Sequence, residues 1–224
     1  MSIFDTSVSA GGGSVTTPTA SAQIAAVKNN EVVLAYGANS NTAVAAFGGA
    51  WHALLLNFNA SGQLAWQKVN AGGPVGLSYA VPGTQAWTLM LASFGSNAIP
   101  VFTARANNQN APFPFTALAN FAGGDAGFVF CEYHSNASPG IAVGLSDDRG
   151  NTWHQLIATG IRNPPGQLAQ LNVFWAENLA AGATNLTFTG SNSGSLACTW
   201  ACYEVTGLAP VGGLRLLSMT GVGI

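Results

Sequence analysis

The sequence predicts an all-β protein made of two tandem β-sandwich domains that arose by internal duplication. Two observations lead to this prediction. Short segments rich in β-branched and aromatic residues recur about every 8–12 residues, with Gly, Pro, Asn and Ser between them. A phrase of Gly, Trp-His and an apolar pair also occurs twice, as GGAWHALL at 48–55 and GNTWHQLI at 150–157. No segment keeps the 3.6-residue period of a helix.

The predicted strands follow one another through both halves of the chain. In the first half they are EVVLAY at 31–36, ALLLNF at 53–58, AWTLML at 86–91 and PVFTAR at 100–105. In the second half they are GFVFCEY at 127–133, LNVFWAE at 171–177, TNLTFTG at 184–190 and LACTWACYEV at 196–205. Runs of this length and composition are typical of strands in sandwiches, and both jelly-roll and immunoglobulin-like topologies fit the pattern.

The duplication hypothesis rests on further matches around the Trp-His phrases. Val32, Leu34 and Tyr36 are matched with Val129, Cys131 and Tyr133, and the segment 79–97 is matched with 177–192. Because these matched segments follow one another in the same order in both halves, we predict two copies of about 100 residues each. The expected domains are therefore an N-terminal arm at 1–22, a first sandwich at 23–108, a linker at 109–114 and a second sandwich at 115–224.

Parity along the strands predicts how the Trp-His phrases are used. Trp51 and Trp153 each follow a Gly turn and are expected to close the core of their own sandwich. Successive residues of a strand point to opposite faces, so His52 and His154 are expected on the other side.

The composition excludes several classes of function. Charged residues make up 6% of the chain and the net charge is −2, against about 25% charged residues in an ordinary soluble domain. Without a basic patch, nucleic acid is not an expected partner, and no apolar run approaches the ~20 residues of a membrane-spanning helix. The first residues lack the basic and apolar regions of a secretory signal. So few charges suggest a surface covered by other subunits, or one that works outside the cell.

The second half resembles a known kind of module. DDRGNTWHQLI, FWAENLAAGATNLTFTGS and CYEVTGL are similar to motifs of β-sandwich modules in bacterial surface proteins and in phage structural proteins of the decoration or fibre type. The resemblance covers about residues 115–208, and the first copy lacks the Asp, the Asn and the closing Glu. It implies an accessory, adhesive or assembly module and no catalytic residues.

Three clusters of reactive side chains are weighed against structural roles. Cys131, His134, Cys198 and Cys202 have zinc-ligand types, but Cys198 and Cys202 would lie ~13 Å apart along one strand, so core thiols or one cross-strand disulfide fit better. The run 147–151, DDRGN, has calcium-ligand types without an EF-hand spacing, and a hairpin turn fits better. Glu132, Glu177 and Glu204 have no counterparts in the first copy. We expect no catalytic residues, no cofactor and no metal.

The remaining candidate residues are aromatic or apolar. Trp66 and Trp175 are the expected contacts for glycans, because exposed aromatic rings can stack on sugars. Phe128 and Phe130 lie on the face of their strand opposite to Cys131, so both faces are apolar, and the two phenylalanines are expected contacts between domains or, in an assembly, between subunits. Ile3 and Phe4 are expected assembly contacts in an arm that lies on a neighbouring copy.

These observations favour a non-enzymatic structural or assembly protein on a virion or extracellular surface. Its expected partners are copies of itself or other virion or surface proteins, and its expected mechanism is packing of low-charge β-sandwich faces. A carbohydrate-binding or adhesion module that uses exposed Trp residues is the alternative. A glycosidase or esterase is a weaker alternative, because the chain has no HExxH or GxSxG motif.

Overall fold

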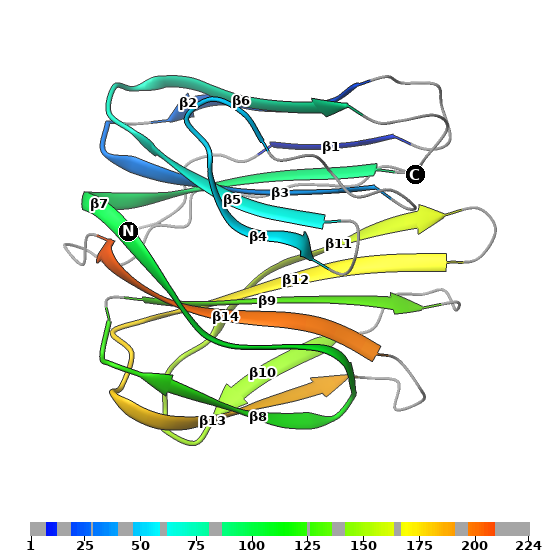
Figure 1. The fold of residues 1–224 in the computed structure, drawn as a ribbon, viewed down its shortest axis with the longest axis vertical. Coiled ribbons are helices and arrows are strands. Elements are labelled where there is room, and N and C mark those ends of the chain that lie inside the picture. Colours follow the sequence, from blue (N-terminus) through cyan, green and yellow to red (C-terminus); the bar gives the residue numbers. More distant parts are fainter. Residues whose placement is uncertain are drawn as a thin grey trace.

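All the regular elements that the structure describes are β-strands, as the sequence predicts. The structure is a computed structural model. It describes residues 8–12, 19–27, 29–39, 47–58, 62–80, 87–124, 126–135, 142–163, 167–190 and 197–208. In this part of the chain no helix is long and apolar enough to cross a membrane. The protein is an all-β fold of several antiparallel sheets, consistent with a β-sandwich (Figure 1).

Nine strands form one large antiparallel sheet. Eight of them follow the order β11-β12-β9-β14-β7-β3-β5-β4, and β1 also pairs with β7. Their bounds are β1 (Val8–Gly12), β3 (Glu31–Asn39), β4 (His52–Phe58), β5 (Gly62–Val69), β7 (Trp87–Pro112), β9 (Ala126–Ser135), β11 (His154–Asn163), β12 (Gln167–Glu177) and β14 (Ala197–Leu208). The two halves of this order have the same pattern. Taken from each outer edge inward, β4-β5-β3-β7 corresponds to β11-β12-β9-β14 in the succession of the strands along the chain.

Two smaller sheets cover the outside of the large one. One has the order β10-β13-β8 and the other consists of β2 and β6. Their bounds are β2 (Thr19–Val27), β6 (Gly73–Ala80), β8 (Phe115–Phe121), β10 (Val143–Asp147) and β13 (Gly182–Gly190). Buried and exposed residues alternate along β6, β8 and β13. Each small sheet therefore has one face on a core and one face toward solvent.

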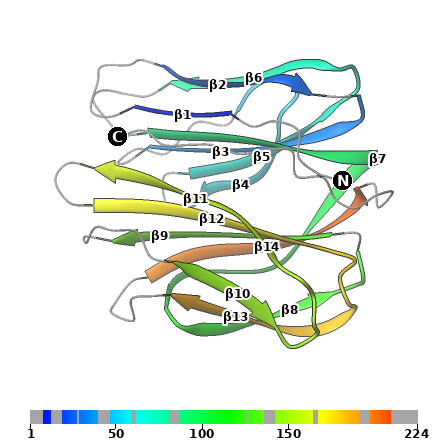
Figure 2. The ribbon, with the colours of Figure 1, turned by 180° about the vertical axis from the view of Figure 1, so that it is seen from behind.

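Strand β7 belongs to both halves of the molecule. Residues 87–95 of β7 pair with β3, and residues 101–112 pair with β14. The large sheet therefore continues from one half into the other, and the halves stack face to face. Figures 1 and 2 show four layers along the long axis, with β2 and β6 at one end and β8, β10 and β13 at the other.

Three hydrophobic clusters lie between these layers. The central cluster joins the two halves and consists of Val32, Leu34, Tyr36, Ala38, Leu64, Met90, Ala92, Phe94, Ala126, Phe128, Phe130, Leu171, Val173, Trp175, Ala201, Tyr203, Val205 and Leu208. The N-terminal cluster lies under β2 and β6 and includes Ile24, Val33, Ala35, Phe47, Leu77 and Tyr79. The C-terminal cluster lies under β8, β10 and β13 and includes Phe121, Val129, Cys131, Phe174, Phe188, Cys198 and Cys202.

The register shows how the two halves correspond. His52 and Leu34 lie opposite Trp66 on either side of β5. In the other half, His154 and Phe128 lie opposite Trp175 in the same way. These pairs make Leu34 of the first half structurally equivalent to Phe128 of the second half. A shared origin of the two halves by duplication stays a prediction.

Two of the predicted matches do not agree with this register. Leu34 belongs to the central cluster and Cys131 to the C-terminal cluster, so the two face opposite sides of the sheet. An odd shift along a strand reverses every side chain, which explains the error. The downstream match also fails, because residues 87–97 lie in β7 of the large sheet and residues 182–190 form β13 of a small one.

The predicted arm and linker lie on strands of the two halves. Within the predicted arm, residues 8–12 form β1 on this chain's own β7, and residues 19–22 begin β2. Residues 109–112, at the start of the predicted linker, are the end of β7. The cis Phe113–Pro114 peptide bond then leads into β8. Apolar side chains of both halves pack against each other in the central cluster.

Candidate functional site

The two Trp-His phrases occupy equivalent places at the edges of the large sheet. Trp51 packs against the N-terminal cluster and Trp153 against the C-terminal cluster. The histidine that follows each tryptophan begins an edge strand, β4 or β11. Each histidine side chain lies on the face of the sheet opposite to the tryptophan that precedes it, and there it contacts a different tryptophan. This confirms the prediction that the Trp and His of each phrase face opposite sides.

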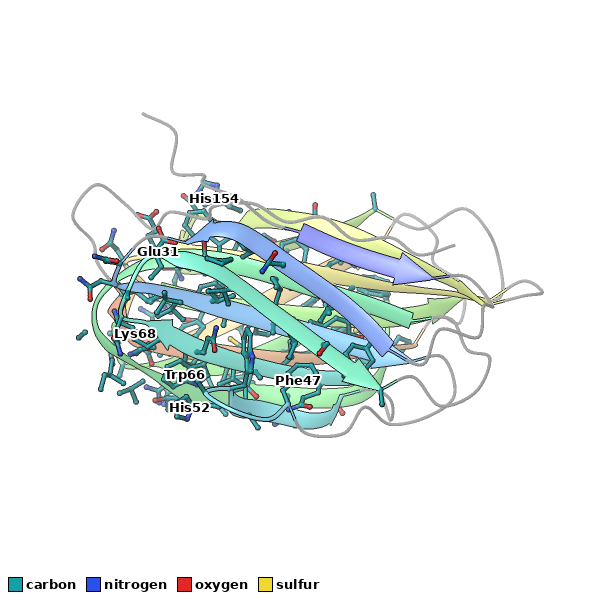
Figure 3. All side chains as sticks on the ribbon, turned by 90° about the horizontal axis from the view of Figure 1, so that it is seen from above. Glu31, Phe47, His52, Trp66, Lys68 and His154 are labelled. Atoms are coloured by element: carbon teal, nitrogen blue, oxygen red, sulfur yellow. The ribbon has the colours of Figure 1, made fainter. Side chains whose placement is uncertain are left out.

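Both histidines stack on a tryptophan of the neighbouring strand. His52 lies on Trp66 with 4.5 Å between ring centroids and 25° between planes. His154 lies on Trp175 at 4.6 Å and 29°. Figure 3 shows His52 and Trp66 together at one side of the molecule and His154 at the opposite side. The sequence predicted the face of each histidine but not its partner, because the partner lies one strand away in an unknown register.

The two stacked tryptophans differ in exposure. Trp175 is 6% exposed and belongs to the central cluster. Its ring is covered on one side by the core and on the other by His154, so the predicted role as a surface platform for glycans does not fit. Trp66 is only partly buried against the same cluster, and its ring centroid lies 5.5 Å from that of Phe102. Trp66 is therefore the tryptophan of this pair that solvent can reach.

Polar groups lie beside Trp66. Lys68, two residues further along β5, donates from Nζ to the carbonyl oxygens of Asn30 and Ser96, each at 3.2 Å. Partial burial lowers the pKa of the Lys68 amine. The Ser96 hydroxyl oxygen lies 2.6 Å from the carbonyl oxygen of Ala98 and 2.8 Å from that of Gly207, and its single proton is donated to one or shared between the two. These bonds join the end of β5 to β7, and β7 to β14, beside the aromatic group of His52, Trp66 and Phe102.

The predicted assembly contacts Phe128 and Phe130 are fully buried, at 0% exposure, in the central cluster. The Phe128 ring meets Phe94 of the first half edge to face, with centroids 4.9 Å apart. Phe128 thus packs between the two halves of the same chain, as the inter-domain alternative predicts, and neither buried phenylalanine presents surface to a second copy. Ile3 and Phe4 lie outside the described residues.

The turn at 147–153 is held by a network centred on Asp147. The carboxylate of Asp147 accepts bonds from the backbone N–H of Arg149 at 2.9 Å and of Asn151 at 3.1 Å. It also accepts from the Asn151 amide and the Trp153 indole, both at 2.7 Å. Asn151 Oδ1 in turn accepts from the N–H of Ala180 at 2.9 Å. Both oxygens of Asp147 thus serve N–H donors, which explains the D-x-x-G-N-T-W pattern as a turn rather than a calcium loop.

A buried carboxylate, that of Glu204, holds the β8–β9 turn. Glu204 is 2% exposed. It accepts bonds from the N–H of Ala122, at 2.9 Å to Oε2, and of Gly124, and it forms an ion pair with Arg105. Burial alone would raise the pKa of Glu204, but these N–H groups and the guanidinium outweigh burial and lower it. Glu204 is the Glu of the CYEVTGL motif, but the motif did not indicate that its carboxylate holds this turn.

The three glutamates considered for catalysis do not come together. Glu132 and Glu204 lie opposite positions 199 and 127 on their neighbouring strands. Positions 132 and 127 of β9 are about 16 Å apart along the strand, beyond the ~5–9.5 Å of a glycosidase pair. Glu177 lies opposite Ala126, which faces the central cluster. Glu204 lies opposite Gly127, the next residue of β9, and therefore points to the other side of the sheet. These two carboxylates are on different faces.

The three cysteines are buried free thiols of the C-terminal cluster. A hydrogen bond to Cys198 and burial raise the pKa of Cys131, and burial raises the pKa of Cys202. Such thiols are protonated at neutral pH and behave as small apolar residues. The His134 side chain lies outside the described residues. Among the side chains that the structure describes, no three His, Cys, Asp or Glu residues are grouped as metal ligands.

Comparisons of the chain with models of known protein families, with curated proteins and with solved structures find no match. The resemblance of the second half to β-sandwich modules of surface and phage proteins therefore stays a prediction. The geometry itself offers one partly exposed aromatic site around Trp66. The carboxylates of Asp147 and Glu204 accept hydrogen bonds from the backbone of turns in the same chain.

Proposed function

We propose that this protein is a non-enzymatic structural subunit that assembles with copies of itself, or with other proteins, on a virion or extracellular surface. The observation that carries the proposal is that only 6% of the residues are charged and that several of these side chains form hydrogen bonds and ion pairs within the chain, which leaves few charges on its outward faces. Most of those with described contacts bond to groups of their own chain, and these are Lys68, Arg105, Asp147, Asp148, Arg149 and Glu204.

The outward faces of the small sheets fit this proposal. The exposed positions of β6, β8 and β13 are all uncharged: Pro74, Gly76, Ser78, Ala80, Thr116, Leu118, Asn120, Ala183, Asn185 and Thr189. Faces built from β6 and β8 can meet without removing ions from water, a step that costs several kcal/mol per ion, whereas Asp148 and Arg149 are bonded to Asn185 and Ala183 of β13. Depletion of charge is also the compositional mark of the buried part of protein interfaces.

The test is the native mass of the full chain. Light scattering after gel filtration, over a concentration series, measures the mass, and negative-stain images of the same peak show the shape. We expect a closed oligomer or a filament. A monomer at every concentration, with featureless images, would remove the proposal and its explanation of the low charge.

Carbohydrate binding is the second candidate, and the partly exposed ring of Trp66 favours it. Because His52 stacks on Trp66 and the Phe102 ring lies 5.5 Å from it, a sugar would contact the exposed part of this three-ring group, with Lys68 beside it as a polar group. Titration of the full chain with a panel of glycans, followed by intrinsic fluorescence, tests this candidate. A response that Trp66→Ala abolishes and Val101→Ala leaves unchanged supports it, and an unchanged signal with every glycan rejects it.

A further inference from the structure

Strand β8 has one side without a strand partner among the described residues. Its other side pairs with β13 over its whole length, from Phe115 opposite Phe188 to Phe121 opposite Gly182. The chain enters β8 through the Phe113–Pro114 turn at the end of β7. An unpaired strand edge presents a row of backbone N–H and C=O groups that can pair with another chain.

Several other edge strands carry features that oppose such pairing. The register of β4 shifts twice against β5, and that of β11 shifts once against β12. The outer strand β2 also shifts against β6. Strand β10 has only five residues and ends at the charged Asp147. Bulges, short length and charge are the usual protections of sheet edges. Strand β8 has seven residues, a continuous register and no charged residue.

The sequence of β8 is nearly the same in both directions. It reads Phe-Thr-Ala-Leu-Ala-Asn-Phe over 115–121, with Leu118 at its centre. Antiparallel pairing of two such strands about a two-fold axis at Leu118 places each residue opposite one of matching kind. Phe115 meets Phe121 of the other copy, Thr116 meets Asn120, Ala117 meets Ala119, and Leu118 meets itself. A two-fold interface requires this kind of self-complementarity.

The exposed side chains of β8 fit the same pairing. Leu118 is 61% exposed, one of the few large apolar side chains in the described part of the chain that face solvent. Its outward neighbours Thr116 and Asn120 are exposed and uncharged. Opposed Thr and Asn side chains can exchange hydrogen bonds, and two leucines directly opposite each other bury apolar surface. No like charges meet, because neither copy brings any to the strand.

We infer that β8 pairs with β8 of a second copy in antiparallel fashion, so that the β10-β13-β8 sheets of both copies become one continuous sheet. This inference rests on the proposed assembly function and names the surface that assembly would use first. The occupant is a second copy of this chain, and the axis passes near Leu118.

The first test compares two matched substitutions by light scattering. Leu118→Lys puts a charge opposite its own copy in the pairing, whereas Val101→Lys changes an apolar residue of similar exposure, 58%, on β7. We expect Leu118→Lys to lose the two-fold contact, seen as a halved mass or shortened filaments, and Val101→Lys to keep the wild-type mass. If Leu118→Lys also keeps it, this inference is wrong while the assembly proposal stands.

The second test reads the register directly. The native thiols are buried, so in a Leu118→Cys variant the new thiol is the accessible one. Two such thiols and oxidised glutathione give a disulfide between copies and two reduced glutathiones. Residues directly opposite have Cα atoms about 4.5–5.5 Å apart, within disulfide reach. The two Thr116→Cys thiols would be about 13 Å apart and should not cross-link.

The outcomes separate the two ideas. A covalent dimer of Leu118→Cys, with none for Thr116→Cys, supports the pairing. An oligomeric wild type whose Leu118→Cys variant stays uncross-linked overturns the pairing alone. A wild type that is monomeric throughout, with no cross-link in either variant, overturns both the pairing and the assembly function.

Discussion

Replacing Glu204 by Gln should destabilise the protein strongly, because the carboxylate is buried and serves three partners. Gln keeps the shape and one acceptor oxygen, but it turns the other oxygen into a donor. That donor must face either the backbone N–H of Ala122 and Gly124 or the guanidinium of Arg105. The loss of one charge-assisted hydrogen bond costs about 1.5–3 kcal/mol. Removing one partner of a fully buried ion pair costs about 3–5 kcal/mol, which is an upper bound here because the Arg105 side chain is 25% exposed.

We therefore expect the free energy of unfolding to fall by about 3 kcal/mol. For a chain of 224 residues this corresponds to a decrease in Tm of about 6–12 °C. Denaturant unfolding followed by tryptophan fluorescence measures it. The matched control is Glu177→Gln, at a half-buried carboxylate at the end of β12. A Glu204→Gln loss no larger than that of the control would refute the reasoning.

The Glu204 carboxylate also predicts how the free energy of unfolding changes with pH. Its pKa is lowered in the folded protein, so the unfolded chain binds protons more readily than the native one. The stability that Glu204 contributes is full above the unfolded pKa of Glu, about 4.3, and is lost as the pH falls through the lower folded pKa. The difference between wild type and Glu204→Gln should therefore shrink in acid, and a difference that stays constant with pH would contradict this cause.

Three further outcomes are expected. Asp147→Ala should cost about 2–3 kcal/mol in denaturant unfolding, since four N–H groups lose their acceptor, and a loss near zero would mean that the turn holds without it. Trp175→Ala should cost about 3–5 kcal/mol as a core truncation, whereas Trp66→Ala should cost less because its ring is partly exposed. The raised pKa values of Cys131 and Cys202 predict that native thiols react slowly with a thiol reagent and quickly after unfolding. Fast reaction of the native protein would show that the C-terminal cluster opens.

The sequence supported the fold class because strand patterning is local. The alternation along β13 and the apolar faces of β9 are readable from residue types alone, whereas no strand was predicted for β6 although it alternates in the same way. The layer arrangement was not readable, because it depends on β7. Gly95, Asn97 and Pro100 interrupt its apolar pattern and suggest two strands, yet β7 runs through all three.

Residue roles were harder to predict where both faces of a strand are buried. Trp175 and Trp66 look alike in sequence, and only the central cluster decides that Trp175 is covered and Trp66 is not. In the same way, the match of Leu34 with Cys131 failed by an odd shift that no local pattern reveals, because apolar residues occupy both parities there. The Glu204 clamp joins residues about 80 positions apart, and such a distance carries no periodic signal.

The shared strand β7 has a consequence for how the molecule comes apart. One half cannot leave the other without breaking the ladder between β7 and β14 and exposing the central cluster, so melting should be a single transition and not two. A chain cut within β7 would likewise leave two fragments that need each other: each would keep part of the sheet and an uncovered apolar face. Mixed together, such fragments should recombine into the native fold, and apart they should aggregate.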